Sequence, residues 1–203
     1  MIERLFSRTM SAQCRRAYYS LKQLLPFKYL LDSQTKLLLC ESLVLSLLDY
    51  GDIVYGPCIN QSDGQRLQKV QNLCFRYITF IPRFSHVTPY IRSFNRLRMQ
   101  ERRFLHYSTF LYEIIDSGRP EYLLNKLSSR SDAHDLNLRY VRSMLSIPRH
   151  TSSFFKCSFS YLSVYLFNNF LCKNEFNNVL LLKNYIKTCI FSDNLGSVNI
   201  HLF

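Results

Sequence analysis

Apolar side chains recur every three or four residues through much of the chain, and this spacing constrains the fold more than any other feature. The repeat is clearest between Ser62 and Pro82, at Leu67, Val70, Cys74, Tyr77, Ile78 and Ile81. Such spacing gathers the apolar groups on one face of an α-helix. Ser62 and Gln65 have the spacing of a capping box, and Pro82 cannot continue a helix. The pattern therefore predicts an amphipathic helix over residues 62–81.

The same reasoning predicts helices in other parts of the chain. Segment 34–49 is almost solidly apolar, which indicates a helix buried on more than one side. Segment 99–117 is amphipathic and is followed by Gly118, which suits the position just after a helix. Further helices are expected over 12–31 (ending near Pro26), from 88 onward, and over 120–127, 160–171 and 177–190. Alternating and aromatic residues favour a few short strands between residues 136 and 160. The expected fold class is mainly α.

One polar run divides the chain. Residues 128–135, SSRSDAHD, are the best candidate for a linker. They separate a helical region, 1–127, from a mixed C-terminal region, 136–203. The last twelve residues or so are weakly patterned, and we expect them to fray. The residues directly after Gly51 are expected to form a short extended piece or a turn.

The composition favours a folded intracellular protein with a polyanionic partner. The hydrophobic share of 47% is too high for a disordered chain. The net charge of +12, most of it in residues 1–103, favours nucleic acid first and an anionic membrane surface second. Seven widely spaced cysteines without a preceding signal sequence are typical of reduced thiols. We therefore expect a nuclear or cytoplasmic protein that is not secreted. The longest apolar run, 37–48, is too short to span a membrane.

The sequence lacks the side-chain patterns that most enzymes need. Two-metal catalysis requires a close pair of carboxylates, yet no two acidic residues are adjacent. The nearest pair, Asp49 and Asp52, flanks a Tyr-Gly dipeptide, and we interpret both as turn residues. No two cysteines lie within four residues of each other, which argues against zinc, and the glycines do not cluster into a phosphate loop. The prediction is a chain with no catalytic residue, no cofactor and no metal.

Two groups of basic residues are the candidate nucleic-acid contacts. The first group has one acid, Glu101, among six arginines: Arg83, Arg92, Arg96, Arg98, Arg102 and Arg103. The second group consists of Arg139, Arg142, Arg149, His150 and Lys156. Arginine grips phosphate through two parallel hydrogen bonds and stacks on bases. The expected partner is the backbone of RNA or DNA, bound without sequence preference. The alternative is a solvated basic face that serves solubility alone.

Several sequence blocks resemble the region after the palm in reverse transcriptases of non-LTR (LINE-type) retrotransposons, of the jockey and X-element kind. The run LLLCESLVLSLLDYGDIVYG (37–56) is similar to an apolar helix followed by Leu-(Asp/Glu)-Tyr-Gly and Val-Val-Trp-Gly, and RLQKVQNLCFRYI (66–78) is similar to the next block. Five more follow in the family order: PRFSHVTPY (82–90), LRMQERRFLHYSTFLYEII (97–115), GRPEYLL (118–124), PRHTSSFFKCSFSY (148–161) and LFNNF (166–170). The chain departs from the family where Tyr55 and Phe167 replace tryptophans and Arg98 replaces a proline.

The resemblance implies a thumb-like and post-thumb helical region, which in such enzymes holds the template–primer duplex. It implies no palm and no Asp-Asp motif. The chain would then be a non-catalytic fragment of an RNA-directed DNA polymerase, with Met1 an internal start in a truncated element. The expected function is residual nonspecific binding of RNA or DNA. The alternatives are a protein-interaction module repurposed from the element and a pseudogene product without function. Without the palm, apolar surface over 37–48 would be exposed, and the chain would self-associate through it.

Overall fold

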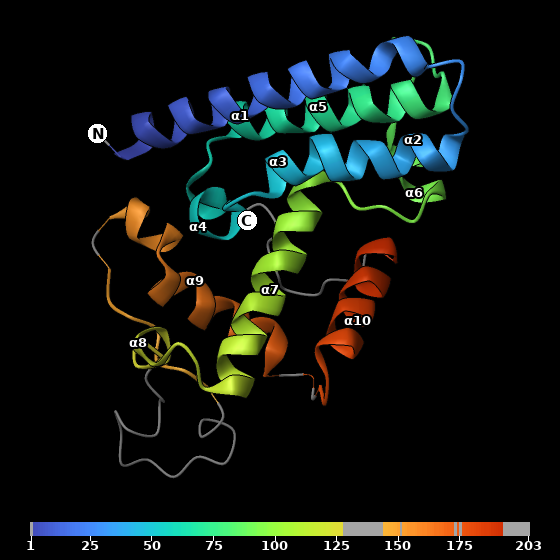
Figure 1. Ribbon diagram of the computed structural model, residues 1–203. Helices are drawn as coiled ribbons and strands as arrows, with labels where there is room; N and C mark the ends of the chain where they lie inside the picture. Colours follow the sequence, from blue (N-terminus) through green and yellow to red (C-terminus); the bar gives the residue numbers. More distant parts are fainter. Residues whose placement is uncertain (1, 128–143, 151, 173, 175, 193–203) are drawn as a thin grey trace, which may run out of the picture. The chain divides into compact units, whose positions relative to one another are not determined.

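The computed structural model describes residues 2–127, 144–150, 152–172, 174 and 176–192 (Figure 1). These residues form a mainly helical protein, which confirms the expected fold class. The chain divides into two compact units, residues 1–103 and residues 104–203. None of the described helices has the length and apolar character needed to cross a bilayer.

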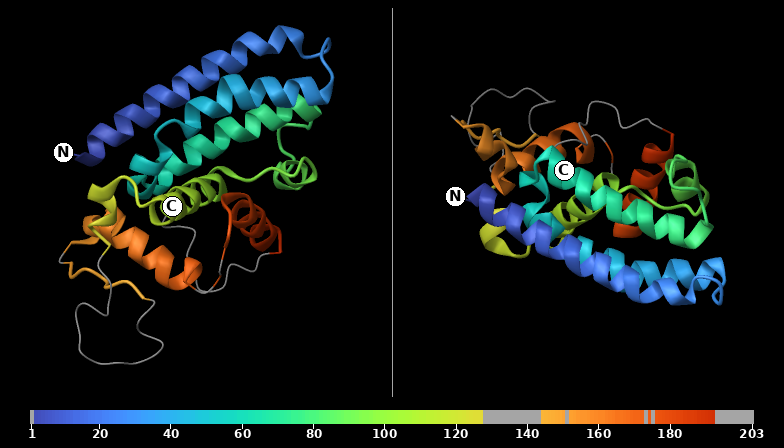
Figure 2. Two further views of the ribbon diagram at one scale, coloured as in Figure 1. Left: turned by 60° about the horizontal axis from the view of Figure 1, so that its bottom comes forward. Right: turned by 90° about the horizontal axis from the view of Figure 1, so that it is seen from above.

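The first unit is built on three helical segments that lie side by side (Figures 1 and 2). α1 (Ile2–Leu24) and α5 (Gln61–Thr79) run in the same direction and contact each other. The third segment runs the opposite way and contacts both. It consists of α2 (Ser33–Cys40), a π-helical stretch (Glu41–Leu45) and α3 (Ser46–Asp49). Fully buried side chains fill the space between the segments: Ala17, Cys40, Val44, Leu48, Leu67, Val70, Cys74, Phe75 and Ile78.

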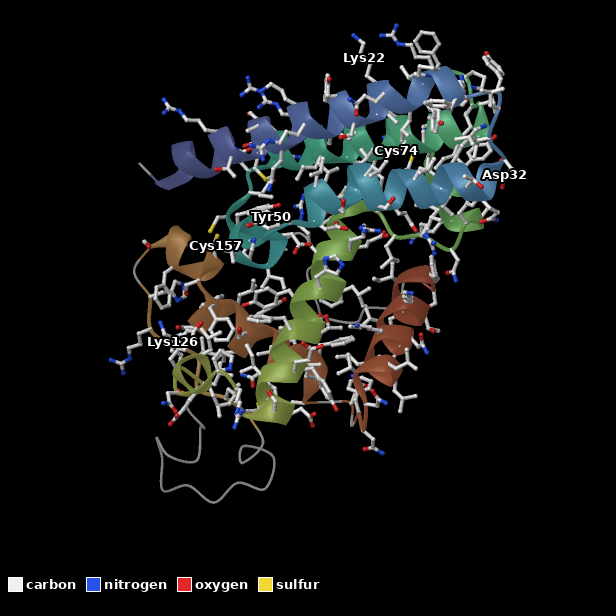
Figure 3. All side chains as sticks on the ribbon, in the orientation of Figure 1. Lys22, Asp32, Tyr50, Cys74, Lys126 and Cys157 are labelled. Atoms are coloured by element: carbon white, nitrogen blue, oxygen red, sulfur yellow. The ribbon has the colours of Figure 1, made fainter. Side chains whose placement is uncertain are left out.

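Short polar side chains cap two helices of this unit, α2 and α5. Asp32, labelled in Figure 3, accepts hydrogen bonds at the start of α2 from the backbone N–H groups of Gln34 (3.0 Å) and Thr35 (3.2 Å). Asn60 has extended backbone just before α5, and its side chain accepts from the N–H three residues later at 2.8 Å. The helix expected over 62–81 is therefore present but begins at Gln61. The capping box expected at Ser62 is wrong, because that residue already lies inside the first turn.

The link between α3 and α5 is a tight helical turn. Gly51 has a φ of +71°, a conformation that favours glycine, and α4 (Asp52–Tyr55) follows it directly. The Tyr55 hydroxyl lies 2.7 Å from the Tyr50 carbonyl, to which Gln13 of α1 also donates at 3.1 Å. These hydrogen bonds fold the link back onto the end of α3. The extended piece or turn expected directly after Gly51 is wrong, because these residues form α4 and then a 3-10 helix (Gly56–Cys58).

Two glutamines of α5 hold the start of α7 (Met99–Ser117), which follows α6 (Thr88–Ser93) in the chain. Gln71 is fully buried and donates from Nε2 to the Leu97 carbonyl at 2.8 Å. Gln68 accepts from the Met99 N–H at 3.1 Å and donates to the Gln71 side chain at 2.8 Å. A buried amide without partners costs free energy, so these bonds fix one position for the segment that enters α7.

The second unit contains the rest of α7 and several shorter elements. These are α8 (Glu121–Leu124), a 3-10 turn (Ser153–Cys157), α9 (Phe159–Leu166), a π-helical stretch (Phe167–Leu171) and α10 (Val179–Phe191). In the interior, the hydroxyls of Tyr107 and Ser163 lie 2.8 Å apart, and burial raises the pKa of Tyr107 above its ordinary value. Phe104 packs edge-on against Phe170 at 5.7 Å between ring centroids. The unit therefore has its own apolar core around α7.

The helices expected near 34–49, 62–81, 99–117 and 177–190 are all present. In the described part of the segment expected to hold strands, residues 144–150 and 152–160, there are one isolated bridge residue, Leu145, the 3-10 turn and the start of α9. The Leu145 backbone pairs with the side-chain amide of Asn168, at 2.8 and 2.9 Å, so a side chain takes the place of a partner strand. Residues 136–143, the linker expected at 128–135 and residues 193–203 of the end expected to fray lie outside the described residues.

Candidate nucleic-acid interface

The six arginines between residues 83 and 103 have very different surroundings, and Arg92 illustrates the first kind. Its Nη2 donates to Glu101 Oε1 at 2.7 Å, and its Nη1 donates to Glu101 Oε2 at 3.0 Å. Glu101 also accepts from the Arg98 backbone N–H at 2.8 Å, at the start of α7. One carboxylate therefore caps the helix and orients Arg92. The guanidinium group of Arg92 therefore uses both of its terminal nitrogens to bind Glu101.

Arg96 and Arg102 make similar two-point contacts with the segment from α2 to α3. Arg96 holds Glu41 through Nε and Nη2, the latter at 3.0 Å, and Arg102 holds Asp49 through Nε, at 3.2 Å, and Nη2. Burial alone would lower the pKa of Arg102, but the Asp49 carboxylate raises this pKa above its ordinary value. The Arg102 and Asp49 side chains are each 18% exposed, so solvent screens this pair only weakly. Both ion pairs join residues more than fifty positions apart.

Arg103 is buried, whereas Arg83 and Arg98 are exposed. Burial lowers the pKa of the Arg103 guanidinium, and its Cδ lies 3.3 Å from the place that a Cβ would take on Gly56. A guanidinium enclosed in this way does not reach a phosphate outside the protein. The contact of the first group with nucleic acid stays a prediction, and the geometry favours only Arg83 and Arg98 for it.

In the second group, Arg149, His150 and Lys156 are exposed. Arg149 and His150 line an open pocket together with Phe155. The His150 ring lies nearly parallel to the Phe155 ring, with 6.4 Å between centroids and 7° between planes. The structure thus brings two members of this group to one site in the second unit, while Lys156 lies beside it in the chain. The other two members, Arg139 and Arg142, lie outside the described residues.

Among the described residues, the most regular outward row of positive charge lies on α1, and none of its residues was among the site residues predicted from the sequence. Arg8, Arg15 and Lys22 are exposed and seven residues apart, just under two helical turns, so they lie in one row. We call this row the α1 basic stripe. Figure 3 shows Lys22 pointing away from the bundle. The opposite side of α1 is buried, with Met10, Cys14, Ala17, Leu21 and Leu24.

Neighbouring residues extend the positive charge of the α1 basic stripe. Arg16 is exposed on the same helix, and Arg66 and Lys69 are exposed on α5, which contacts α1. Arg66 pairs with Asp63 at 3.1 Å, but the Asp63 side chain is only 4% exposed, so the negative charge of this pair is turned inward. Residues 4–31 contain no acidic residue. A polyanion would therefore meet cations along this face without a carboxylate from residues 7–24 of α1.

The sequence did contain a signal for this stripe. Positions 8, 15 and 22 are basic at heptad spacing, while an apolar row of the same helix, Met10, Cys14, Ala17, Leu21 and Leu24, falls on the opposite side. The high local density of arginine instead favoured residues 83–103 as the binding site in the sequence-based prediction. The carboxylates that neutralise part of that cluster, Glu41 and Asp49, lie far from it in the sequence.

Comparisons of the chain with protein-family models, with curated proteins and with solved structures find no match. The candidate interface therefore rests on the geometry of the described residues. These residues place outward cations on α1 and α5, and they place four arginines of the predicted group in ion pairs or in the interior.

Proposed function

We propose that this chain binds the sugar–phosphate backbone of RNA and DNA, without sequence preference, through the α1 basic stripe. The observation that carries the proposal is the stripe itself: Arg8, Arg15 and Lys22 form an outward row on a helix face, within a segment that has no acidic residue. Surfaces that serve solubility usually intersperse charges of both signs. A row of one sign instead creates a field that attracts a polyanion.

The length of the stripe suits a nucleic-acid backbone. Its ends, Arg8 and Lys22, are about 21 Å apart along the helix axis, at about 1.5 Å per residue. Over that distance one strand of a duplex carries roughly six phosphates. Contacts to phosphate position a protein on nucleic acid but read no sequence. Their free energy comes largely from the release of counterions, so binding through the stripe weakens as salt rises.

We further propose that the chain is a non-catalytic part of a non-LTR retrotransposon reverse transcriptase, corresponding to its thumb-like and post-thumb region. Support comes from the residues inside the resembling blocks, because several of them hold the first unit together. Tyr50 and Gly51 form the link after α3, and Gln68 and Gln71 hold the start of α7. A chain that keeps these contacts keeps a helical scaffold on which a duplex can be held. Since the sequence has no Asp-Asp pair, the proposed role is binding without polymerisation.

A protein-interaction role is the second candidate, and one observation favours it. Leu38 and Leu43, on the segment from α2 to the π-helical stretch, are 66% and 48% exposed. Leu39 and Leu47, in the same segment from α2 to α3, are only partly buried. Exposed apolar residues of this kind mark a surface that a second copy or another protein can cover. Binding there would depend little on salt, because it buries apolar area rather than neutralising charge.

A salt titration tests the proposed function against this second candidate. Fluorescence anisotropy would measure the affinity of the purified chain for two unrelated duplex DNA sequences and for RNA of the same length. We expect similar affinities for all three and a steep fall with salt. Sequence-dependent or salt-independent binding would contradict backbone binding through the stripe, and no binding at low salt would refute it. Primer extension on an RNA template, above a control without protein, would contradict the non-catalytic role.

A further inference from the structure

Two exposed aromatic rings lie at the end of the first unit where α1 and α5 both finish. Tyr29, in the loop after α1, is 84% exposed, and Phe80, directly after α5, is 46% exposed. Their ring centroids are 5.5 Å apart and the ring planes are tilted by 33°. A hydrogen bond from the Lys28 N–H to the Leu25 carbonyl, at 3.1 Å, helps to hold the loop. The rings are therefore placed by local structure while much of their surface stays open to solvent.

Two lysine ammonium groups contact this aromatic pair. Lys28 Nζ lies 4.8 Å from the centroid of the Phe80 ring and 5.9 Å from that of Tyr29. Lys36 Nζ lies 4.3 Å from the Phe80 centroid, and Lys36 is buried. Cation–π attraction of this kind keeps two positive charges beside the rings. A ligand on this surface would meet the aromatic rings and the Lys28 ammonium together, whereas Lys36 is only 2% exposed and lies beneath them.

Phe80 has a backbone conformation that phenylalanine disfavours. Its φ of +59° lies in the left-handed region, where glycine is the usual residue after a helix. Glycine here would relieve the strain and would remove a half-exposed apolar ring from water. The placement of the ring suits a ligand that is flat, apolar on its faces and anionic at its edge.

We propose that Tyr29, Phe80 and Lys28, together the Tyr29–Phe80 platform, stack unpaired bases of single-stranded RNA or DNA, with Lys28 contacting the adjoining phosphate. This inference rests on the proposed function and names the part of a nucleic acid that this end of the unit takes. The α1 basic stripe ends at Lys22, and the platform follows after the short turn Leu25–Phe27. A strand whose phosphates follow the stripe therefore continues onto the rings. Aromatic stacking accepts every base, which matches binding without sequence preference.

The test measures anisotropy with three probes of one length, roughly 15 nucleotides: a single strand, the matching duplex, and an abasic strand that keeps the sugar–phosphate backbone. Tyr29→Ala removes the more exposed ring, and Tyr29→Phe keeps a ring. Tyr50→Ala is the matched control, because Tyr50 is 78% exposed and lies outside the platform. Circular dichroism would confirm that the variants fold.

We expect Tyr29→Ala to bind the single strand between about five-fold and about a hundred-fold more weakly than the natural chain, the range typical of base–aromatic stacking. Its affinity for the duplex and for the abasic strand should not change, and its salt dependence should not change because tyrosine is uncharged. Tyr29→Phe and Tyr50→Ala should bind like the natural chain. Unchanged single-strand affinity in Tyr29→Ala, or an equal loss on the abasic strand, would overturn the platform and leave the stripe intact. If the natural chain binds none of the three probes at low salt, the proposed function and the platform both fail.

Discussion

Replacing Arg102 by glutamine should destabilise the first unit, because it leaves the Asp49 carboxylate without its two-point partner. Breaking a buried ion pair by removing one member costs about 3–5 kcal/mol, whereas an exposed pair contributes about 0–1 kcal/mol. The Arg102 and Asp49 side chains are each 18% exposed, which lies nearer to the buried case. Water still reaches part of Asp49 after the change and offsets some of the loss. We therefore expect the free energy of unfolding to fall by about 2 kcal/mol.

Urea unfolding followed by circular dichroism measures this loss. With a slope of about 2 kcal/mol per molar urea, the midpoint for Arg102→Gln should fall by about 1 M. Arg98→Gln is the matched control, because it removes the same group from an exposed position four residues earlier. Its free energy of unfolding should stay within about 0.5 kcal/mol of the natural chain. If both variants unfold at the same urea concentration, Arg102 does not stabilise the unit in the way that its contacts indicate.

Three further predictions concern a turn, a cap and an apolar surface. Gly51→Ala should lower the thermal midpoint of unfolding more than Gly118→Ala. Both residues have a positive φ, which costs alanine about 1–2 kcal/mol, but only at Gly51 would the new Cβ also meet a side chain, the Tyr55 ring at 3.2 Å. Equal losses in the two variants would contradict this reasoning. Hydrogen bonds from Thr35 hold the pKa of Asp32 below its ordinary value, so this cap contributes stability above about pH 4 that is lost as the pH falls through the folded-state pKa. An acid titration followed by circular dichroism should show that loss in the natural chain and not in Asp32→Asn, which keeps an uncharged cap; identical profiles would refute it. Leu38→Glu should reduce self-association in sedimentation velocity, and a natural chain that is already monomeric would show that the exposed leucines form no interface.

The sequence predicts those features of the fold that depend on local pattern. The apolar repeat over 62–81 is enough to find α5, because helical spacing places Leu67, Val70 and Cys74 on one face that must be buried. The start of this helix is missed by one residue, since both Asn60 and Ser62 are suitable caps and only the surrounding backbone decides between them. The strand content expected within 136–160 is too high for the described part. The backbone of Leu145 forms hydrogen bonds with the side chain of Asn168, in the π-helical stretch after α9, and not with a second strand.

The candidate site was harder to predict, because its charges are paired over long distances in sequence. Arg96 and Arg102 appear in the sequence as members of a basic cluster with a single acid. Their partners, Glu41 and Asp49, belong to a segment that is mostly apolar in sequence and lies far from the arginines along the chain. Only the packing of that segment beside the start of α7 brings the opposite charges together. The α1 basic stripe, in contrast, follows from heptad spacing alone. A search for basic rows opposite apolar rows finds it, whereas a search for local charge density does not.

The claim that the α1 basic stripe is the phosphate-binding surface is tested most directly by comparing two variants that each lose three positive charges. One carries Arg8→Gln, Arg15→Gln and Lys22→Gln. The other carries Arg83→Gln, Arg98→Gln and Lys126→Gln, which are exposed cations elsewhere on the described surface.

The measurement is the dependence of the dissociation constant for duplex DNA on salt concentration, for the natural chain and both variants. Each phosphate contact contributes about 0.9 to the slope of the logarithm of affinity against the logarithm of salt. Our account predicts that the stripe variant binds more weakly and with a slope shallower by up to about 2.7, while the second variant keeps nearly the natural slope. Equal slopes for the two variants would contradict the stripe as the binding surface, and a larger loss in the second variant would move that surface to the arginines between residues 83 and 98.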